Sequence, residues 1–195
     1  MRYLLFADIH GNLESFLAVL KFIQKKKIDY YIFLGDIVGY GASPNEIIQK
    51  IHTLKPISMI RGNHDKAVCG LDSIETFNFI AASAIYWTKK HILKKNSDFL
   101  LRFFGHTHFP FIYTKRENVV EETFLIGNSN EIKIEKGVQY LINPGSVGQP
   151  RDRNPLAACA IYDSQARKIK FYRLEYDREE TQRKIIEANL PPALA

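Results

Sequence analysis

Four short motifs in this sequence combine aspartate, histidine and asparagine with glycine. They are Asp8-Ile9-His10, Gly35-Asp36, Gly62-Asn63-His64-Asp65 and Gly105-His106-Thr107-His108. Four of the six histidines of the chain fall in these motifs, and none of the motifs contains a cysteine. Carboxylate, amide and imidazole groups without thiolate are ligands suited to Mn²⁺, Fe, Co²⁺, Ni²⁺ or Zn²⁺. The motifs therefore indicate a metal centre.

Each motif taken alone also has a purely structural interpretation. Asp8 could form a turn before a helix, Gly35-Asp36 a tight turn, and Asn63 the cap of a short helix. His106 and His108 could face solvent. The occurrence of all four motifs in one chain is difficult to explain by turn chemistry, so the joint pattern favours a metal site.

Each motif directly follows a strand-like apolar run. These runs cover residues 2–7, 30–35, 57–62 and 101–105. Helical patterns over 13–27 and 44–54 separate the first three runs, which predicts βαβ units and a parallel core sheet. In open α/β sheets, ligands bind at the carboxyl ends of the strands. We therefore expect the four motifs to meet at one edge of the sheet.

The second half of the chain has a different pattern. Short strands are expected over 109–114, 118–126, 131–136, 139–143, 157–163 and 168–174. Two further helices are expected near 75–95 and 178–189. The sequence predicts one α/β domain over residues 1–195, with a more antiparallel second half. His52 and His91 lie in helical patterns away from the motifs, and we interpret both as ordinary surface or half-buried residues.

Composition restricts the class of protein. The chain is 46% hydrophobic and 25% charged, and its longest apolar run is too short to span a membrane. The two cysteines are isolated, which argues against a disulfide framework. We expect a cytoplasmic protein without membrane contact. The net charge of +6 comes largely from lysines at helix ends, so a nucleic-acid partner is permitted but not indicated.

Longer phrases around the motifs resemble a known family. The stretches FLGDIVGYGASPNE (33–46) and INPGSVGQPRDRNPLAACAIYD (142–163), together with the four motifs, are similar to the calcineurin-like metallophosphoesterases. The similarity is greatest to the small bacterial and archaeal phosphodiesterase branch and covers residues 1 to about 175. It implies an αββα sandwich of two mixed sheets flanked by helices, with a two-metal site between the sheets.

The resemblance also implies a set of metal ligands. Asp8, His10, Asp36 and His108 would hold one divalent ion. Asp36, as a bridging carboxylate, would hold the second ion together with Asn63 and His106. Mn²⁺ is the expected metal, with Fe, Ni²⁺, Co²⁺ and Zn²⁺ as alternatives.

The activity implied is metal-dependent hydrolysis of a small anionic phosphoester, with phosphodiester or nucleotide-type substrates expected. A hydroxide bridging the two ions would be the nucleophile. His64 would be the general acid for the leaving group, with Asp65 orienting its ring. Arg151 could contact a substrate phosphate or pair with Asp152, and Asn12 could cap a helix or contact substrate. A homo-oligomer is left open.

The sequence departs from the family pattern in one place. Family members carry another strand between the second-last and last motifs, ending in a His-Gly-Ser-Pro-like sequence whose histidine binds the second metal. Here residues 96–100 run directly into the fourth motif. We therefore expect that a segment is missing after about Leu100. A non-catalytic scaffold on the same fold and a nuclease are the alternatives. The four motif histidines and the two motif aspartates Asp8 and Asp36 favour an enzyme over the scaffold, whereas the modest basic charge neither demands nor excludes a nuclease.

Overall fold

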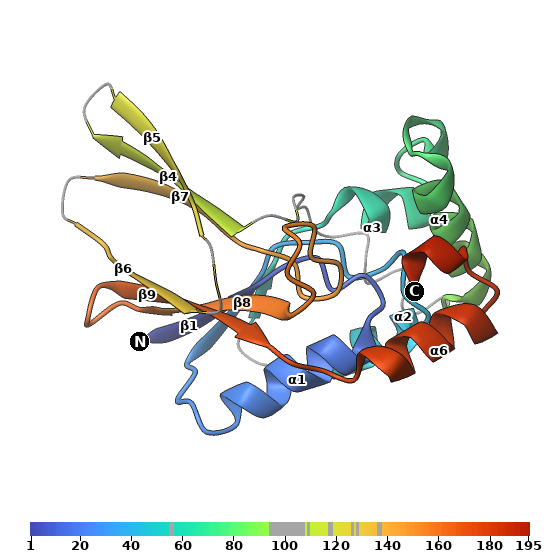
Figure 1. Cartoon of the computed structure of the whole chain (residues 1–195), viewed down its shortest axis with the longest axis horizontal. Helices are drawn as coiled ribbons and strands as arrows, with labels where there is room; N and C mark the ends of the chain where they lie inside the picture. The colour runs from blue at the N-terminus through green and yellow to red at the C-terminus, as the bar shows by residue number, and fades with distance from the viewer. Residues whose placement is uncertain are drawn as a thin grey trace.

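The computed structural model describes residues 1–54, 57–93, 108, 110–116, 119–125, 127, 129–135 and 138–195. Within these residues the chain forms two β-sheets with helices packed beside them (Figure 1). Strands and helices alternate first: β1 Arg2–Phe6, α1 Leu13–Ile23, β2 Tyr30–Phe33, α2 Pro44–Thr53 and β3 Ile57–Met59. Helices then follow: α3 Asn63–Val68, the 3-10 helix η1 Ile74–Thr76 and α4 Phe79–His91.

The second half consists mainly of antiparallel strands. They are β4 Pro110–Arg116, β5 Val119–Phe124, β6 Ser129–Lys133, β7 Gln139–Pro144, β8 Ala157–Asp163 and β9 Lys168–Leu174. The helix α6 Arg178–Glu187 and the 3-10 helix η2 Pro192–Leu194 come last. Throughout the described part of the chain, every helix is too short or too polar to cross a membrane.

The strands form one large and one small sheet. In the large sheet the order is β3-β2-β1-β8-β9-β6, and in the small sheet it is β5-β4-β7. β1, β2 and β3 pair in parallel, whereas β8 joins β1 in the antiparallel sense. The predicted parallel N-terminal unit and the more antiparallel second half are both confirmed.

The pairing of β1 with β2 brings two motifs together. Phe6 and Phe33, the last residues of the two strands, lie opposite each other. The chains then leave the sheet side by side, because the N–H of Asp8 donates to the carbonyl of Gly35 at 2.8 Å. In the same way the N–H of His10 donates to the carbonyl of Asp36 at 3.0 Å. The first and second motifs are therefore held in register by backbone hydrogen bonds.

Apolar side chains fill both faces of the large sheet. On the helix side, Leu4, Phe6 and Phe16 belong to one buried cluster, and on the other side Ile169 and Phe171 pack with Ile112 of the small sheet. Figure 1 shows α1 and α6 below the large sheet and the small sheet above it. The predicted fold class, a two-sheet α/β sandwich flanked by helices, is confirmed.

Several predicted boundaries differ from the observed ones. α1 ends at Ile23 instead of residue 27, so the lysines at 25–27 follow the helix. α4 begins at Phe79 instead of residue 75, because the Asn78 side chain caps it by accepting from the N–H of Ala81 at 3.0 Å. β8 and β9 have the predicted bounds. The strand predicted over 101–105 lies outside the described residues.

The fold predicts a large stability effect at Phe16. Its ring is fully buried and lies 5.8 Å from that of Phe6, so it attaches α1 to β1. We expect Phe16→Ala to lower the free energy of unfolding by about 3–5 kcal/mol, because the cavity left is apolar and closed. The matched control is Phe79→Ala, since Phe79 is 81% exposed. Urea unfolding of both variants measures the difference, and equal losses would contradict this packing.

Candidate metal centre

The loops that follow β1 and β2 hold site residues in a left-handed backbone conformation. The φ angle is 52° at Asp8, 49° at His10 and 57° at Asp36. Residues with a Cβ atom adopt this conformation at a cost of about 1–2 kcal/mol each. It is maintained by the hydrogen bonds that join the two loops, including one of 2.9 Å from the N–H of Gly11 to the carbonyl of Ile37. Backbone strain of this kind concentrates at functional sites.

Four of the predicted ligands converge on one point. One ligand atom from each lies within 4.8 Å of the others: Asp8, His10, Asp36 and His108. All four residues are buried, and the most exposed of them shows 3% of its surface. Asp8 and His10 follow β1, Asp36 follows β2, and His108 precedes β4. The carboxyl ends of parallel strands and one residue from the second half of the chain therefore build the cluster.

The two histidine rings of the cluster face each other through their Nε2 atoms, which are 3.0 Å apart. Their Nδ1 atoms lie 3.0 Å from the carbonyl oxygen of Val38 for His10 and 2.6 Å from that of Gln149 for His108. Because a carbonyl oxygen only accepts, each Nδ1 carries the proton, and each neutral ring presents a lone pair at Nε2. An N–H···O=C bond on the far nitrogen is typical of metal-bound histidine.

Both rings are therefore arranged as ligands. Burial and the neighbouring imidazoles of His108 and His64 hold the pKa of His10 well below its ordinary value, which favours the neutral ring. Two lone pairs directed at each other repel unless a cation accepts both. Two nitrogens about 2.1 Å from one ion at an angle near 90° lie about 3.0 Å apart. The observed separation fits two adjacent ligands of one metal ion.

The oxygen donors of the site support the same interpretation. Within the described residues, both carboxylate oxygens of Asp8 and Oδ1 of Asn63 are buried and accept no hydrogen bond. Burial and the negative charge of Asp36 raise the pKa of Asp8 well above its ordinary value. A buried carboxylate without a partner is strongly destabilised. A divalent cation would satisfy these oxygens, so the residues present fit the metal centre that the sequence predicts.

Asp65 organises the backbone beneath this cluster. Its Oδ2 accepts hydrogen bonds of 3.0 Å from the N–H groups of Asp36 and Gly62. Its Oδ1 accepts from the N–H groups of Ile37 at 2.9 Å and Val38 at 3.2 Å. Burial and the charge of Asp36 raise the pKa of Asp65 to about 8, while the N–H donors oppose that rise. These contacts favour a different role from the predicted orientation of the His64 ring, because Asp65 fixes the loop that carries Asp36.

His64 lies at the border of the cluster. It is 3% exposed, and its ring centroid is 4.8 Å from that of His10 and 4.5 Å from that of Tyr40. The ring of Phe77 packs edge-on at 5.1 Å. The backbone N–H of His64 donates to Oδ1 of Asp36 at 3.0 Å. His64 is therefore fixed beside the candidate ligands.

Three further residues were singled out by the sequence: His106, Asn63 and Asn12. His106 lies outside the described residues. Asn63 is the first residue of α3 and Gly62 holds the cap position, so the alternative in which Asn63 caps that helix is wrong. Asn12 caps α1, since its Oδ1 accepts from the N–H of Ser15 at 3.0 Å, and its Nδ2 also donates to Gly148 at 3.1 Å.

The two histidines outside the motifs lie away from the cluster. His52 is on the exposed side of α2, and His91 is exposed at the end of α4. The ring of His91 stacks on Trp87, with the ring centroids 4.1 Å apart. Both were predicted to be ordinary surface or half-buried residues, and the structure confirms this.

Arg151 was left undecided by the sequence. The local ion pair that competed with a phosphate contact does not form, because Asp152 pairs with Arg173. Instead Nη2 of Arg151 donates to the hydroxyl of Tyr40 at 3.0 Å and to Oε1 of Gln149 at 2.9 Å. Its positive charge also acts on the cluster. It opposes the rise in the pKa of Asp8 that burial and Asp36 cause, and it adds to the lowering of the pKa of His10. The sequence QPRD drew attention to Arg151, but only the fold brings this residue beside Tyr40.

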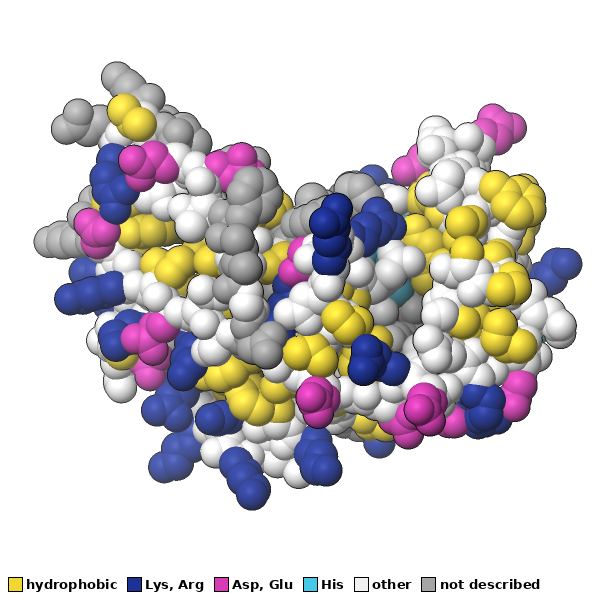
Figure 2. Space-filling view, in the orientation of Figure 1, with side chains coloured by type: hydrophobic (Ala, Val, Ile, Leu, Met, Phe, Trp, Pro, Cys, Tyr) yellow, Lys and Arg dark blue, Asp and Glu magenta, His cyan; other side chains and the backbone are white. Residues whose placement is uncertain are grey.

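One face of the molecule carries a hollow with basic side chains at its border. Figure 2 shows histidine surface within a hollow, with lysine and arginine side chains beside it. The net charge of the chain is +6. An anionic ligand is attracted to such a hollow, because low-dielectric walls focus the field of nearby cations.

The close approach of backbone to the site predicts a requirement for glycine at position 62. A Cβ atom there would overlap the carboxylate of Asp36. We expect Gly62→Ala to displace that carboxylate and to reduce bound metal by at least about 10-fold, since a misplaced ligand loses its coordination geometry. The control is Gly70→Ala, where a Cβ would meet nothing within 4 Å although φ is +74°. Elemental analysis of the folded variants measures metal content. Normal metal content in Gly62→Ala would contradict the geometry.

Comparison with known proteins places the chain among characterised families. The model of the calcineurin-like phosphoesterase family matches residues 1–145. The chain is 36% identical to the uncharacterized protein MJ0912 of Methanocaldococcus jannaschii over 230 aligned positions, covering 95% of this chain and 92% of that protein. It is 25% identical to phosphodiesterase YfcE of Escherichia coli over 166 residues, covering 80% and 84%. The crystal structure of a metallophosphoesterase from Sphaerobacter thermophilus has a TM-score of 0.81 at 31% identity, covering 100% and 96%.

The alignment with MJ0912 has more positions than the 195 residues of this chain, so that protein has residues without a counterpart here. The absence of a segment after about Leu100 stays a prediction, because residues 94–107 lie outside the described part of the chain. The family match and the two relatives above 30% identity agree with the buried Asp and His cluster. The chain therefore belongs to the calcineurin-like phosphoesterases and is a metal-dependent phosphoesterase of the small bacterial and archaeal branch.

Proposed function

We propose that this protein hydrolyses phosphodiester or nucleotide-type substrates at a two-metal centre. Asp8, His10, Asp36 and His108 would hold one ion, and Asp36, Asn63 and His106 the other. The observation that carries the proposal is the 3.0 Å separation of the Nε2 atoms of His10 and His108, next to the unpartnered oxygens of Asp8. The relative YfcE, whose name gives its activity as phosphodiesterase, supports the substrate class.

Mn²⁺ is the metal we propose, and the ligand chemistry suits Fe, Co²⁺, Ni²⁺ or Zn²⁺ as well. When bound, two such ions acidify a water molecule and neutralise charge on the phosphoryl oxygens. Asp36 would be the shared ligand, and the hydrogen bonds from loop 36–38 to Asp65 fix its backbone in advance. Because the protein holds the ligands before the ions arrive, little reorganisation accompanies binding.

His64 would protonate the oxygen of the leaving group. It is not among the four clustered donors, yet its ring lies 4.8 Å from that of His10 and is held by Tyr40 and Phe77. An alkoxide is a poor leaving group, so a positioned acid lowers the barrier to breaking the P–O bond. His64 would not act as a base in this reaction, because its ring must carry the proton before the P–O bond breaks.

Arg151 would bind a non-bridging oxygen of the phosphoryl group. Its guanidinium is oriented by Tyr40 and Gln149 rather than neutralised by a carboxylate within the described residues. A planar guanidinium with free N–H groups matches the oxygens of a phosphate. A non-catalytic scaffold on this fold would need neither this cation nor the clustered donors, so the site favours the enzyme.

The first prediction from this proposal concerns metal removal. We expect exhaustive chelation to abolish hydrolysis of bis-p-nitrophenyl phosphate, and Mn²⁺ to restore it, because no side chain here activates water strongly alone. The melting temperature should fall in parallel. At an ion concentration about 100 times Kd, the bound ion contributes about 2.7 kcal/mol of stability. Full activity in protein shown by elemental analysis to be metal-free would exclude the proposal.

The second prediction separates acid catalysis from metal binding. We expect His64→Ala to keep its metal content and to lower kcat by about 10²–10⁴-fold on substrates with an alkyl or nucleoside leaving group. The loss should be much smaller when nitrophenolate leaves, because that group hardly needs a proton. His91→Ala is the matched control and should behave like the unmodified protein.

Two results would contradict the role of His64. Loss of one metal equivalent in His64→Ala would make this residue a ligand. An equal loss of rate with both kinds of leaving group would make it a phosphate-binding residue.

A further inference from the structure

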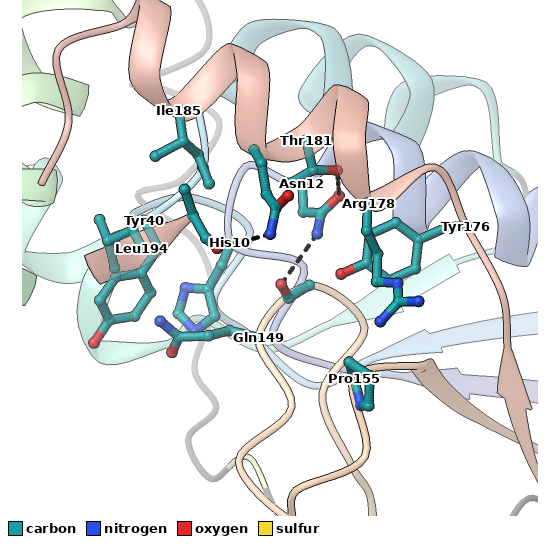
Figure 3. A pocket seen from close by; sticks show the side chains of 14 residues that line it. His10, Asn12, Tyr40, Gln149, Pro155, Tyr176, Arg178, Thr181, Ile185 and Leu194 are labelled. Carbon is teal, nitrogen blue, oxygen red and sulfur yellow. Dashed lines mark hydrogen bonds between the residues drawn. The ribbon is translucent and has the colours of Figure 1, made fainter. Parts of the chain in front are cut away.

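A pocket of about 190 Å³ lies between α6 and the candidate metal centre (Figure 3). Its walls come from the loops after β1, β2 and β7 and from the C-terminal helices. In Figure 3, His10, Tyr40 and Gln149 lie together on one side, and Tyr176 and Arg178 lie on the other. Nothing in the proposed reaction uses this space.

The pocket shares one residue with the candidate metal centre and adjoins it. His10 lines the pocket with its ring and belongs to the donor cluster. Gln149 also lines it, while the carbonyl of the same residue accepts from Nδ1 of His108 at 2.6 Å. A group attached to a phosphoryl unit at the cluster could therefore extend directly into the pocket.

The helix that closes the pocket, α6, is fixed to the start of α1. The hydroxyl of Thr181 donates to Oδ1 of Asn12 at 3.2 Å, and Nζ of Lys184 donates to Oε1 of Glu14 at 2.5 Å. The side chain of Asp177 accepts from the N–H of Glu180 at 3.0 Å and so caps the first turn of α6. The pocket is thus formed before a ligand binds, as is usual for small-molecule sites.

The lining combines apolar surface with hydrogen-bonding groups. Pro155, Ile185 and Leu194 are apolar, and Tyr40 and Tyr176 add aromatic rings. Amide and hydroxyl groups come from Asn12, Gln149, Thr181 and Gln182. Among the lining residues that the structure describes, Arg178 has the one side chain with a fixed charge. Such a lining suits an uncharged or anionic ring system that carries polar substituents.

The volume limits the ligand to one ring system. A closed cavity of about 150 Å³ is sufficient to hold a benzene molecule. The pocket at about 190 Å³ is slightly larger, and His10 of the cluster lies in its wall. A run of several stacked bases would not fit, so this space suits a small ester better than a nucleic-acid strand.

We propose that the pocket between α6 and the metal centre is the subsite for the organic group of the substrate, and that it selects esters bearing one aromatic ring of aryl or nucleobase size. The inference rests on the proposed function, because the phosphoryl group must lie at the metal centre for the ring to reach the pocket. It names Gln182 and Arg178 of α6 as residues that determine specificity.

Phosphonates test this proposal without turnover, since their P–C bond is not an ester. Phenylphosphonate and methylphosphonate share one head group and differ in the ring. We expect the Mn²⁺-loaded protein to bind phenylphosphonate about 10-fold more tightly in calorimetric titration, because the ring leaves water. Gln182→Trp, at an exposed position on the pocket rim, should remove this preference by filling the space and leave the Kd of methylphosphonate within about twofold.

Three further variants complete the experiment. Arg183→Ala is the control on the same helix, since Arg183 is exposed and pairs with Glu180 and Glu187 outside the pocket. It should keep the 10-fold preference, as should Gln182→Ala, which leaves the pocket open. Arg178→Ala should weaken the binding of a carboxylate-substituted phenylphosphonate more than the binding of phenylphosphonate itself.

The outcomes distinguish failure of the subsite from failure of the proposed function. Equal affinity of the unmodified protein for the two phosphonates, or equal weakening of both by Gln182→Trp, would overturn the subsite alone. Failure of both phosphonates to bind the metal-loaded protein would overturn the proposed function, and the subsite with it.

Discussion

The buried carboxylate of Asp65 is the constraint on which the rest of the site depends. Four backbone N–H groups converge on its two oxygens, three from residues 36–38 and one from Gly62. Hydrogen bonds to a charged group contribute about 1.5–3 kcal/mol each. Here they offset only part of the cost of burying the carboxylate beside Asp36, so the pKa of Asp65 is still raised to about 8. Because the donors come from the loops after β2 and β3, one side chain joins two strand ends. The position of Asp36 and the start of α3, which carries His64, both follow from it.

The left-handed residues show how this rigidity is used. Asp8, His10 and Asp36 all adopt positive φ, and so does Tyr40 at the end of the same loop. In extended backbone, successive side chains point to opposite faces. The positive φ angles instead turn the side chains of neighbouring loop residues toward one point. The cost is tolerated because the two loops continue the parallel hydrogen-bonding of β1 and β2 beyond the sheet. The strain and the ligand geometry therefore have the same cause.

The sequence predicted the parts of the molecule that depend on local pattern. The order of strands and helices, the α/β class and the meeting of Asp8, His10, Asp36 and His108 could be inferred from apolar runs that end in polar motifs. The contacts of Asp65 and Arg151 could not, because only folding creates them. Asp65 is adjacent to His64 in sequence yet bonds to a loop 27 to 29 residues away. Arg151 bonds to Tyr40 across 111 residues, and no periodicity reports such a distance. The pocket beneath α6 was missed for the same reason.

The long sequence separations within the site also determine when it can form during folding. Asp8, His10 and Asp36 lie in one βαβ unit, whose contacts are comparatively local. His108 is 98 residues from His10, and the Ser146 hydroxyl that donates to the carbonyl of Asp8 is 138 residues away. Contacts of such high contact order form late, since the loop-closure entropy is lost before the contact contributes. A half-folded chain thus presents an incomplete donor cluster, and we expect tight metal binding only after both halves of the chain have come together.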